Sequence, residues 1–213
     1  MFASTSKDNS NLYLKLLLRK TFLKLAQPEK SVAVDFFAGG GEIAKRLYLG
    51  FEDLHLVERD EKKFSFLEHR FSSTFNVHLW KMDNIEFIRN HLPGIPDLSV
   101  ADFDAYGSPN RQLLEFFKNY RIAQDLLIFA TDGAKLARLR ARRFSPKSYF
   151  AGLDEKSAVG YDPVLVENYE QLIFGFWKEL ADRYAFKIEA FKLIWKKSLG
   201  VAYYGVWLRP KKN

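Results

Sequence analysis

Four acidic side chains follow apolar runs at regular intervals in the first half of the chain. Asp35, Glu58 and Asp83 are separated by 23 and 25 residues, and Asp104 follows the next apolar run. Carboxylates accept hydrogen bonds from a cationic amino group, from ribose hydroxyls or from the exocyclic amine of a base. Intervals of this size fit one β-α unit each. The acids are therefore predicted to gather at the carboxyl ends of neighbouring parallel strands, where open α/β sheets bind ligands.

The first of these acids opens a glycine-rich turn. Asp35 to Gly41 reads DFFAGGG, and glycines there permit positive φ and a close approach of the backbone to a ligand. Joined to the later acids, the turn resembles the cofactor site of Rossmann-like S-adenosylmethionine-dependent methyltransferases. Singly, Glu58 and Asp83 are equally well read as surface acids at strand ends. The predicted cofactor-binding residues are Asp35, Phe36, Gly39, Gly41, Glu58, Arg59, Asp83, Asn84 and Asp102.

The fourth apolar run ends in the octapeptide DFDAYGSP, from Asp102 to Pro109. Methyl transfer to an exocyclic amine needs an acceptor for the amine protons, a plane that stacks the base and an in-line approach to the methyl group. Asp104 is predicted as the acceptor, and Tyr106 as the stacking face for an extruded or single-stranded base. The alternative is a polar turn with a core tyrosine, which fits poorly with two acids at the end of an apolar strand.

This octapeptide resembles the fourth motif, D-x-D-P-F-G-S-P, of the tRNA guanine N2-dimethyltransferases. Asp102, Asp104 and the Gly107-Ser108-Pro109 tripeptide match, and Tyr106 keeps the ring of the phenylalanine. A similar T-D-x-A-x-L stretch occurs at 131–136. The resemblance implies that Asp104 holds the guanine amino group, Tyr106 stacks on the base, and Glu58 and Asp83 bind ribose and adenine. Ala105 departs from the motif, because the proline that would fix φ there is absent.

The elements that must position these residues alternate between short apolar runs and helical patterns. Repeated β-α alternation with such apolar strands indicates a parallel sheet covered on both faces. Runs at 187–194 and 201–208 are joined by a short turn and indicate an antiparallel hairpin. The predicted fold class is α/β, a Rossmann-like doubly wound sheet of seven strands, mostly parallel, with a C-terminal antiparallel hairpin. This is the class I methyltransferase fold.

A leucine-rich basic segment precedes the first strand. Leu14, Leu17, Leu18, Thr21 and Leu25 recur at helical spacing, which predicts an amphipathic helix from Leu12 to Ala26. A helix that covers the sheet is favoured over one that lies on a membrane or on nucleic acid. The expected organisation is therefore an N-terminal cover helix in residues 1–28 and a single methyltransferase catalytic domain in residues 29–213.

Composition narrows the class of protein and of partner. The 213 residues carry a net charge of +7, include no cysteine and have only four histidines, so thiol chemistry and thiolate metal sites are excluded. The absence of a signal-peptide core and of a long apolar run predicts a cytoplasmic protein that does not associate with a membrane. The lack of cysteine and the few histidines predict that it binds no metal. A dense basic segment past the fifth strand is predicted to bind nucleic acid, through Lys135, Arg138, Arg140, Arg142 and Arg143.

These observations together predict an enzyme, an S-adenosylmethionine-dependent N-methyltransferase. Its predicted substrate is an exocyclic base amine of nucleic acid, with guanine N2 in tRNA or other RNA preferred over DNA. The alternatives are a DNA base amino methyltransferase and a nucleic-acid-binding protein that keeps the fold without the chemistry. A nicotinamide oxidoreductase is a further alternative, since Gly39, Gly41 and Ala44 satisfy G-x-G-x-x-A, but it leaves Asp83 and Asp104 without a role.

Overall fold

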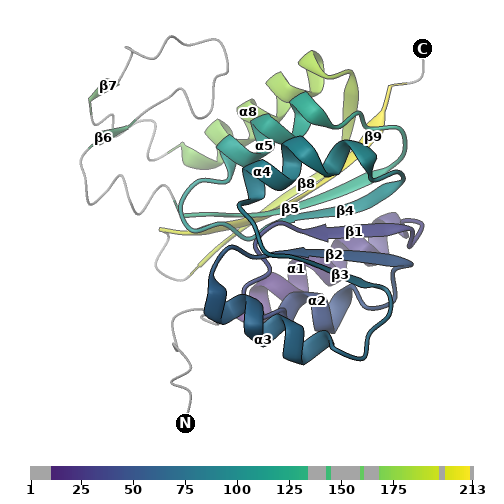
Figure 1. The fold of residues 1–213 in the computed structure, drawn as a ribbon. Coiled ribbons are helices and arrows are strands. Elements are labelled where there is room, and N and C mark those ends of the chain that lie inside the picture. Colours follow the sequence, from purple (N-terminus) through teal and green to yellow (C-terminus); the bar gives the residue numbers. More distant parts are fainter. Residues whose placement is uncertain (1–10, 134–142, 145–158, 161–167, 197–199, 212–213) are drawn as a thin grey trace.

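A seven-stranded sheet forms the centre of the molecule in the computed structural model, which describes residues 11–133, 143–144, 159–160, 168–196 and 200–211 (Figure 1). The strand order is β3-β2-β1-β4-β5-β9-β8. The strands comprise β1 (Val32–Asp35), β2 (Asp53–Val57), β3 (Val77–Trp80), β4 (Leu98–Phe103), β5 (Leu126–Asp132), β8 (Phe186–Trp195) and β9 (Ala202–Pro210). The short strands β6 (Arg143–Phe144) and β7 (Val159–Gly160) pair with each other in a separate sheet.

One strand of the large sheet, β9, runs opposite to the other six. The strands β1 to β5 pair in parallel, whereas β9 is antiparallel to both β5 and β8. The chain order reverses between β1 and β4, where Asp35 lies in register with Asp102. Such a reversal is the point at which open α/β sheets bind ligands, outside the carboxyl ends of the strands.

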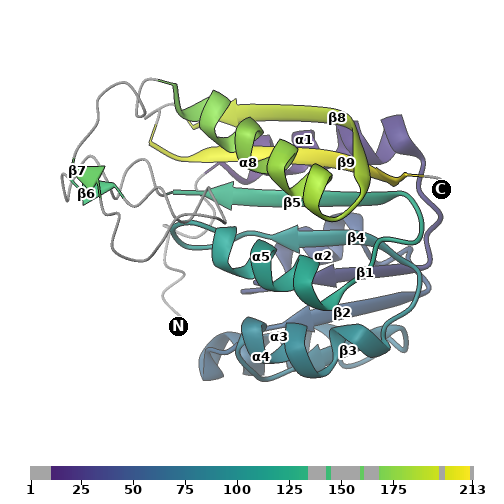
Figure 2. The same ribbon diagram turned by 90° about the horizontal axis from the view of Figure 1, so that it is seen from above.

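Helices cover both faces of the sheet (Figures 1 and 2). One face carries α1 (Leu12–Ala26), α2 (Glu42–Leu47) and α3 (Glu61–Phe71), and the other carries α4 (Asn84–Asn90), α5 (Asn110–Asn119) and α8 (Tyr169–Arg183). A single 3-10 turn, η1 (Leu92–Gly94), follows α4. Two separate apolar clusters fill the layers, one on each face of the sheet.

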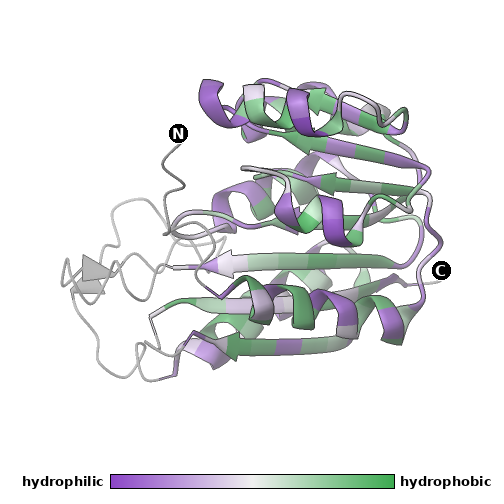
Figure 3. Ribbon diagram, turned by 90° about the horizontal axis from the view of Figure 1, so that it is seen from below, coloured by the Kyte–Doolittle hydropathy of each residue, from purple (hydrophilic) through white to green (hydrophobic). Residues whose placement is uncertain are grey.

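The central strands are largely apolar, as is typical of strands covered on both faces (Figure 3). Every residue of β1, β4 and β5 is buried, including the acids Asp35, Asp102 and Asp132. The predicted doubly wound sheet of seven strands with a closing antiparallel hairpin is therefore confirmed. An acid inside such a strand needs a cation or hydrogen-bond donors close to it, because burying an unpaired charge costs folding free energy.

The helix predicted from Leu12 to Ala26 is α1, and it packs against β5 and β9. Phe22 is buried and meets the ring of Phe129 edge-on, with 6.0 Å between the ring centroids. The buried side chains are Leu18, Arg19 and Phe22, whereas Leu17 and Leu25 stay exposed, so the predicted apolar face was wrong in its rotation. The boundary between residues 1–28 and 29–213 stays a prediction.

Candidate active site

Acidic residues collect at one edge of the sheet because four parallel strands end there. Asp35 is the last residue of β1, Glu58 follows β2 directly, and Asp83 caps α4 after β3. Asp104 follows β4 by one residue. The candidate site therefore spans the carboxyl ends of β3, β2, β1 and β4, with the reversal of strand order at its centre.

The glycine turn is tied to the second strand through Glu58. The Gly39 amide donates a 2.9 Å hydrogen bond to Glu58 Oε2, and the Asp60 amide donates a 2.7 Å bond to Oε1. Gly39 and Gly41 have φ of +54° and +70°, which side chains other than glycine rarely adopt. The turn and the acid of β2 thus form one hydrogen-bonded unit.

Gly41 also faces the underside of α3. A Cβ atom at this position would lie 2.6 Å from Phe71 Cε2 and 2.9 Å from Leu67 Cδ2. We expect Gly41→Ala to lower the free energy of unfolding by about 2 to 4 kcal/mol, from left-handed strain and overpacking together. Gly94→Ala is the control, because a Cβ there meets nothing within 4 Å, and it should change stability by less than about 0.5 kcal/mol. Urea denaturation measures both; equal effects would contradict the packing argument.

The third acid already has local partners. Asp83 Oδ1 accepts a 2.9 Å bond from the Ile85 amide and so caps α4. Its Oδ2 lies 3.2 Å from Nη1 of Arg59, an exposed pair at the edge of the site. The neighbouring Asn84 Oδ1 accepts a 3.3 Å bond from Gln112. Asp83 therefore contacts Arg59, and Asn84 is its neighbour in the chain; their predicted role in binding cofactor stays a prediction.

Asp35 is a buried acid with two other acids nearby. Its side chain is 2% exposed, and Oδ1 accepts a 3.0 Å bond from the Phe37 amide. Burial raises the pKa of Asp35 well above its usual value, and the negative charges of Asp102 and Asp104 add to the rise. The Phe37 amide and the Arg19 guanidinium oppose it. This carboxyl is therefore short of positive charge.

Asp102 is held by the N-terminal helix. Nε and Nη2 of Arg19 donate to its two oxygens, each at 2.6 Å, and the Tyr48 hydroxyl donates to Oδ2 at 2.6 Å. Asp102 is fully buried and Arg19 is 1% exposed. Because the carboxylate is fully buried and both of its oxygens accept from protein donors, a structural role is favoured over the predicted contact with cofactor. Phe36 is likewise internal, its ring stacked on Phe103 at 4.4 Å.

Asp104 lies nearer to solvent, with 17% of its side chain exposed. Lys15 Nζ is 2.6 Å from Oδ2, and the Thr131 hydroxyl donates to Oδ1 in a short hydrogen bond. Burial alone would raise the pKa of Asp104, but the charges of Lys15 and Arg19 and the two hydrogen bonds outweigh it, so the pKa is lowered. Asp104 is an ionised acceptor.

Tyr106 lies two residues further on and is 79% exposed, with the Lys63 ammonium 5.6 Å from its ring centre. It is therefore not the core tyrosine of the alternative interpretation. Ala105 is buried, and the Gly133 amide donates a 2.8 Å bond to the Gly107 carbonyl. That bond joins the turns after β4 and β5, so the octapeptide is braced without the proline of the motif.

Sequence reasoning missed Lys15 and Arg19. They are spaced i, i+4 on α1 and reach acids 89 and 83 residues away. One signal was available: Asp102 sits inside an otherwise apolar strand, and a buried acid requires a cation.

The predicted nucleic-acid residues Lys135, Arg138, Arg140 and Arg142 lie outside the described residues. Arg143 is described only as the backbone of β6, where it pairs with Gly160. Within the described part of the chain, no helix has the length and apolar character to cross a membrane. No group of three or more metal-ligand side chains is found there either.

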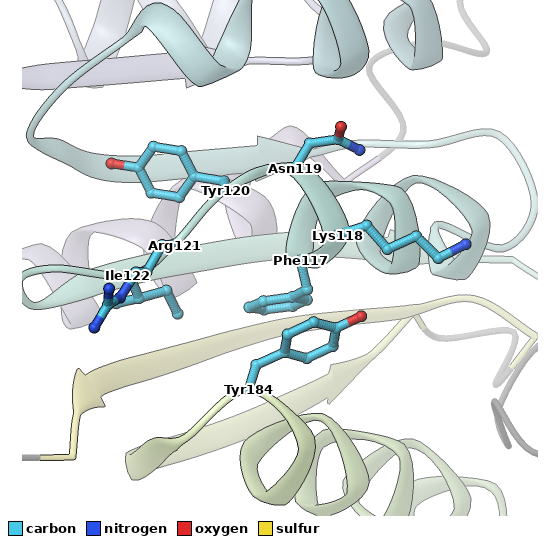
Figure 4. Close-up of a pocket in the computed structure, with 7 residues that line it drawn as sticks. All are labelled: Phe117, Lys118, Asn119, Tyr120, Arg121, Ile122 and Tyr184. Carbon is cyan, nitrogen blue, oxygen red and sulfur yellow. The ribbon is translucent and has the colours of Figure 1, made fainter.

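A surface cavity of about 230 Å³ lies elsewhere (Figure 4). Its wall includes Tyr120, whose hydroxyl accepts a hydrogen bond from the amide of Leu98 at the amino end of β4. The cavity is thus at the opposite edge of the sheet from the acids and has no part in the candidate site. The lining residues are Phe117, Lys118, Asn119, Tyr120, Arg121, Ile122 and Tyr184.

The strand order, the switch between β1 and β4 and the antiparallel β8–β9 ending define the class I methyltransferase fold, and solved structures with this fold resemble the chain throughout. Trm1 from Pyrococcus horikoshii, solved with S-adenosyl-L-methionine, has a TM-score of 0.68 at 17% identity. The similarity covers 94% of this chain and 56% of that one, so the chain spans just over half of Trm1.

Two further structures show the range of similar proteins. TYW2 from P. horikoshii, in complex with MeSAdo, has a TM-score of 0.58 at 16% identity, covering 98% of this chain and 64% of that chain. The putative methyltransferase yhhF from Escherichia coli has a TM-score of 0.54 at 13% identity, covering 92% and 87%. No protein-family model and no curated protein sequence matches the chain. At these identities the likeness establishes the fold.

Proposed function

We propose that this protein is an S-adenosylmethionine-dependent N-methyltransferase that acts on an exocyclic base amine of nucleic acid, with guanine N2 in tRNA or another RNA as the favoured target. The carrying observation is the ionised Asp104 beside an exposed Tyr106, on the same sheet edge as the glycine turn. Trm1, a tRNA N2-guanine dimethyltransferase, is among the structures with this fold, which supports the target.

The chemistry of the edge fits S-adenosylmethionine. Asp35 is buried and short of positive charge, so a cationic ligand would relieve it. In this proposal Asp35 binds the amino-acid portion, the Gly39–Gly41 turn lets the ligand approach the backbone, and Glu58 accepts from ribose hydroxyls. Asp83, with Asn84 and Arg59 beside it, accepts from the adenine amino group. Phe36 and Asp102 would act from within the core, by shaping the strand ends.

When bound, S-adenosylmethionine would supply an electrophilic methyl group for the amine. Tyr106 stacks on the extruded base and thereby fixes the plane of the amine. Asp104 accepts a hydrogen bond from the amine, which raises the electron density on nitrogen. As the new N–C bond formed and the sulfonium S–C bond broke, nitrogen would lose one proton, and an oxygen of Asp104 would accept it. The lowered pKa of Asp104 keeps this acceptor ionised at neutral pH before the reaction.

Incubation of the protein with isotopically labelled cofactor and total RNA or DNA, followed by mass spectrometry of nucleosides, tests the proposal. Label in N2-methylguanosine from RNA is the expected result. Label in DNA adenine or cytosine would instead support the DNA alternative. RNA binding without any label would support the non-catalytic alternative, and enhancement of NADH fluorescence would support an oxidoreductase.

Asp35→Asn separates cofactor binding from stability. The raised pKa means that ionising Asp35 costs folding free energy, a cost that grows as pH rises from the ordinary aspartate value through the raised one. The melting temperature of the variant should therefore exceed that of wild type at neutral pH, by about 2 to 4 °C per kcal/mol of unfolding free energy recovered. At acid pH, where Asp35 is protonated in both the folded and the unfolded state, the two melting temperatures should be the same. The variant should also bind S-adenosylmethionine more weakly by calorimetry. Unchanged affinity would remove Asp35 from the proposed site.

A further inference from the structure

Both oxygens of Asp104 are occupied before any substrate arrives. Lys15 Nζ contacts Oδ2 at 2.6 Å, and the Thr131 hydroxyl donates to Oδ1. The ion pair is shielded, with 12% of the Lys15 side chain and 17% of the Asp104 side chain exposed. A base amine that is to use Oδ2 as its acceptor must take the place of the Lys15 ammonium.

Lys15 is anchored at its backbone, and its ammonium is held by the side chain of Asp104. Nη1 of Arg19 donates a 3.1 Å bond to the Lys15 carbonyl, and Arg19 itself is fixed to Asp102. The Lys15 ammonium lies 5.4 Å from the ring centre of Tyr203. A lysine stem carries a compact charge on rotatable bonds, so it can swing away while the helix stays in place. Arg19 thus binds Asp102, the structural acid, and Lys15 binds Asp104, the proposed reactive acid.

We propose that Lys15 is a positioning residue for Asp104: its ammonium holds the carboxylate in place against Thr131, and the exocyclic amine of the base displaces it on binding. This inference rests on the proposed function. It adds that the N-terminal helix belongs to the active site rather than only covering the sheet. The Lys15–Asp104 ion pair would also select substrates that present an N–H donor strong enough to replace the Lys15 ammonium at Oδ2.

The electrostatic surroundings of Asp104 set the expected pH behaviour. The groups that face it are Lys15 and Arg19 from α1, Asp35 and Asp102 from β1 and β4, Thr131 from β5 and Tyr203 from β9. Burial pushes the pKa of Asp104 up, and the two cations bring it down. Removing the Lys15 charge therefore raises the pKa, so Asp104 becomes protonated, and stops accepting, at a higher pH than in wild type.

Lys15→Met tests the inference with total tRNA as substrate. We expect kcat to fall about tenfold or more because the carboxylate loses its alignment. KM should fall as well, because the competitor for Oδ2 is gone. The acid limb of the pH–rate profile should move to higher pH. The matched control is Lys20→Met, an exposed lysine on the same helix, which should leave all three quantities unchanged.

Lys15→Arg supplies a second variant that keeps the charge. It should restore the acid limb, while its fork-shaped, firmer hold on the carboxylate raises KM. A rise in KM with unchanged kcat in Lys15→Met would make Lys15 a phosphate contact and overturn the inference. Wild-type values in that variant would overturn it too.

A readout that needs no turnover separates this inference from the proposed function. The titration of Asp104, followed by carbon-13 NMR of its carboxyl group in wild type and Lys15→Met, should move to higher pH in the variant. An unmoved titration in a folded variant overturns the positioning role even if wild type is an active methyltransferase. If the titration moves in Lys15→Met while the wild-type protein shows no transferase activity, the Lys15–Asp104 coupling is upheld and the proposed function is rejected.

Discussion

Asp104→Asn is expected to reduce methyl transfer by about 10²- to 10⁴-fold, the usual contribution of a positioned proton acceptor. Asparagine keeps the shape and one oxygen but neither carries negative charge nor takes a proton at neutral pH. Binding of S-adenosylmethionine should stay essentially unchanged, since the proposed cofactor ligands lie at or after the ends of β1, β2 and β3 rather than on the turn after β4. Single-turnover transfer to total tRNA and calorimetry with the cofactor measure the two effects separately.

The substitution also leaves the Lys15 ammonium without its carboxylate, so stability must be controlled. In the double variant Asp104→Asn with Lys15→Met, the melting temperature should recover while activity does not. Asp125→Asn provides a matched single control, because Asp125 pairs with Arg209 at the opposite edge of the sheet. It should retain wild-type transfer. Activity near wild type in Asp104→Asn would remove this residue from the mechanism and leave the non-catalytic alternative.

The strands, and the gathering of acids at their carboxyl ends, could be predicted from local sequence because both depend on short-range patterns. A strand covered on both faces is mostly apolar, so β1, β4 and β5 are visible as predominantly apolar runs. Parallel order then brings the residues after each run to one edge without further information. Asp35, Glu58, Asp83 and Asp104 were located in this way.

The contribution of α1 could not be predicted by the same means. Helical spacing predicted a face through Leu14, Leu17, Leu18, Thr21 and Leu25. The helix buries Leu18 as predicted, but it also buries Arg19 and exposes Leu17. Its rotation is set by two carboxylates at the end of β4, and these are distant in sequence and need cations. Helical periodicity carries no information about such a partner, because a charged residue is counted as solvent-facing by default.

Arg19→Met is expected to be the most destabilising single change at this helix. Burial alone would lower the pKa of Arg19, but the Asp102 carboxylate raises it overall, so the guanidinium stays charged inside the core. Removing it leaves Asp102 fully buried, with the Tyr48 hydroxyl as its only remaining side-chain donor among the residues that the structure describes. Breaking one side of a buried pair costs about 3 to 5 kcal/mol. At about 2 to 4 °C per kcal/mol, the melting temperature should fall by roughly 10 °C.

The double variant Arg19→Met with Asp102→Asn distinguishes a buried charge from a simple loss of packing. Asparagine can still accept from Tyr48 and carries no charge, and neutral replacement of a whole buried pair is often close to neutral in stability. Most of the lost stability should therefore return, and the coupling between the two positions in a double-mutant cycle should be large and favourable. If the two losses instead add, Arg19 stabilises the fold through its contacts with Phe129 and the helix, and Asp102 does not depend on its charge. The cycle thus decides whether α1 is fastened to the sheet by the ion pair or by its apolar side chains.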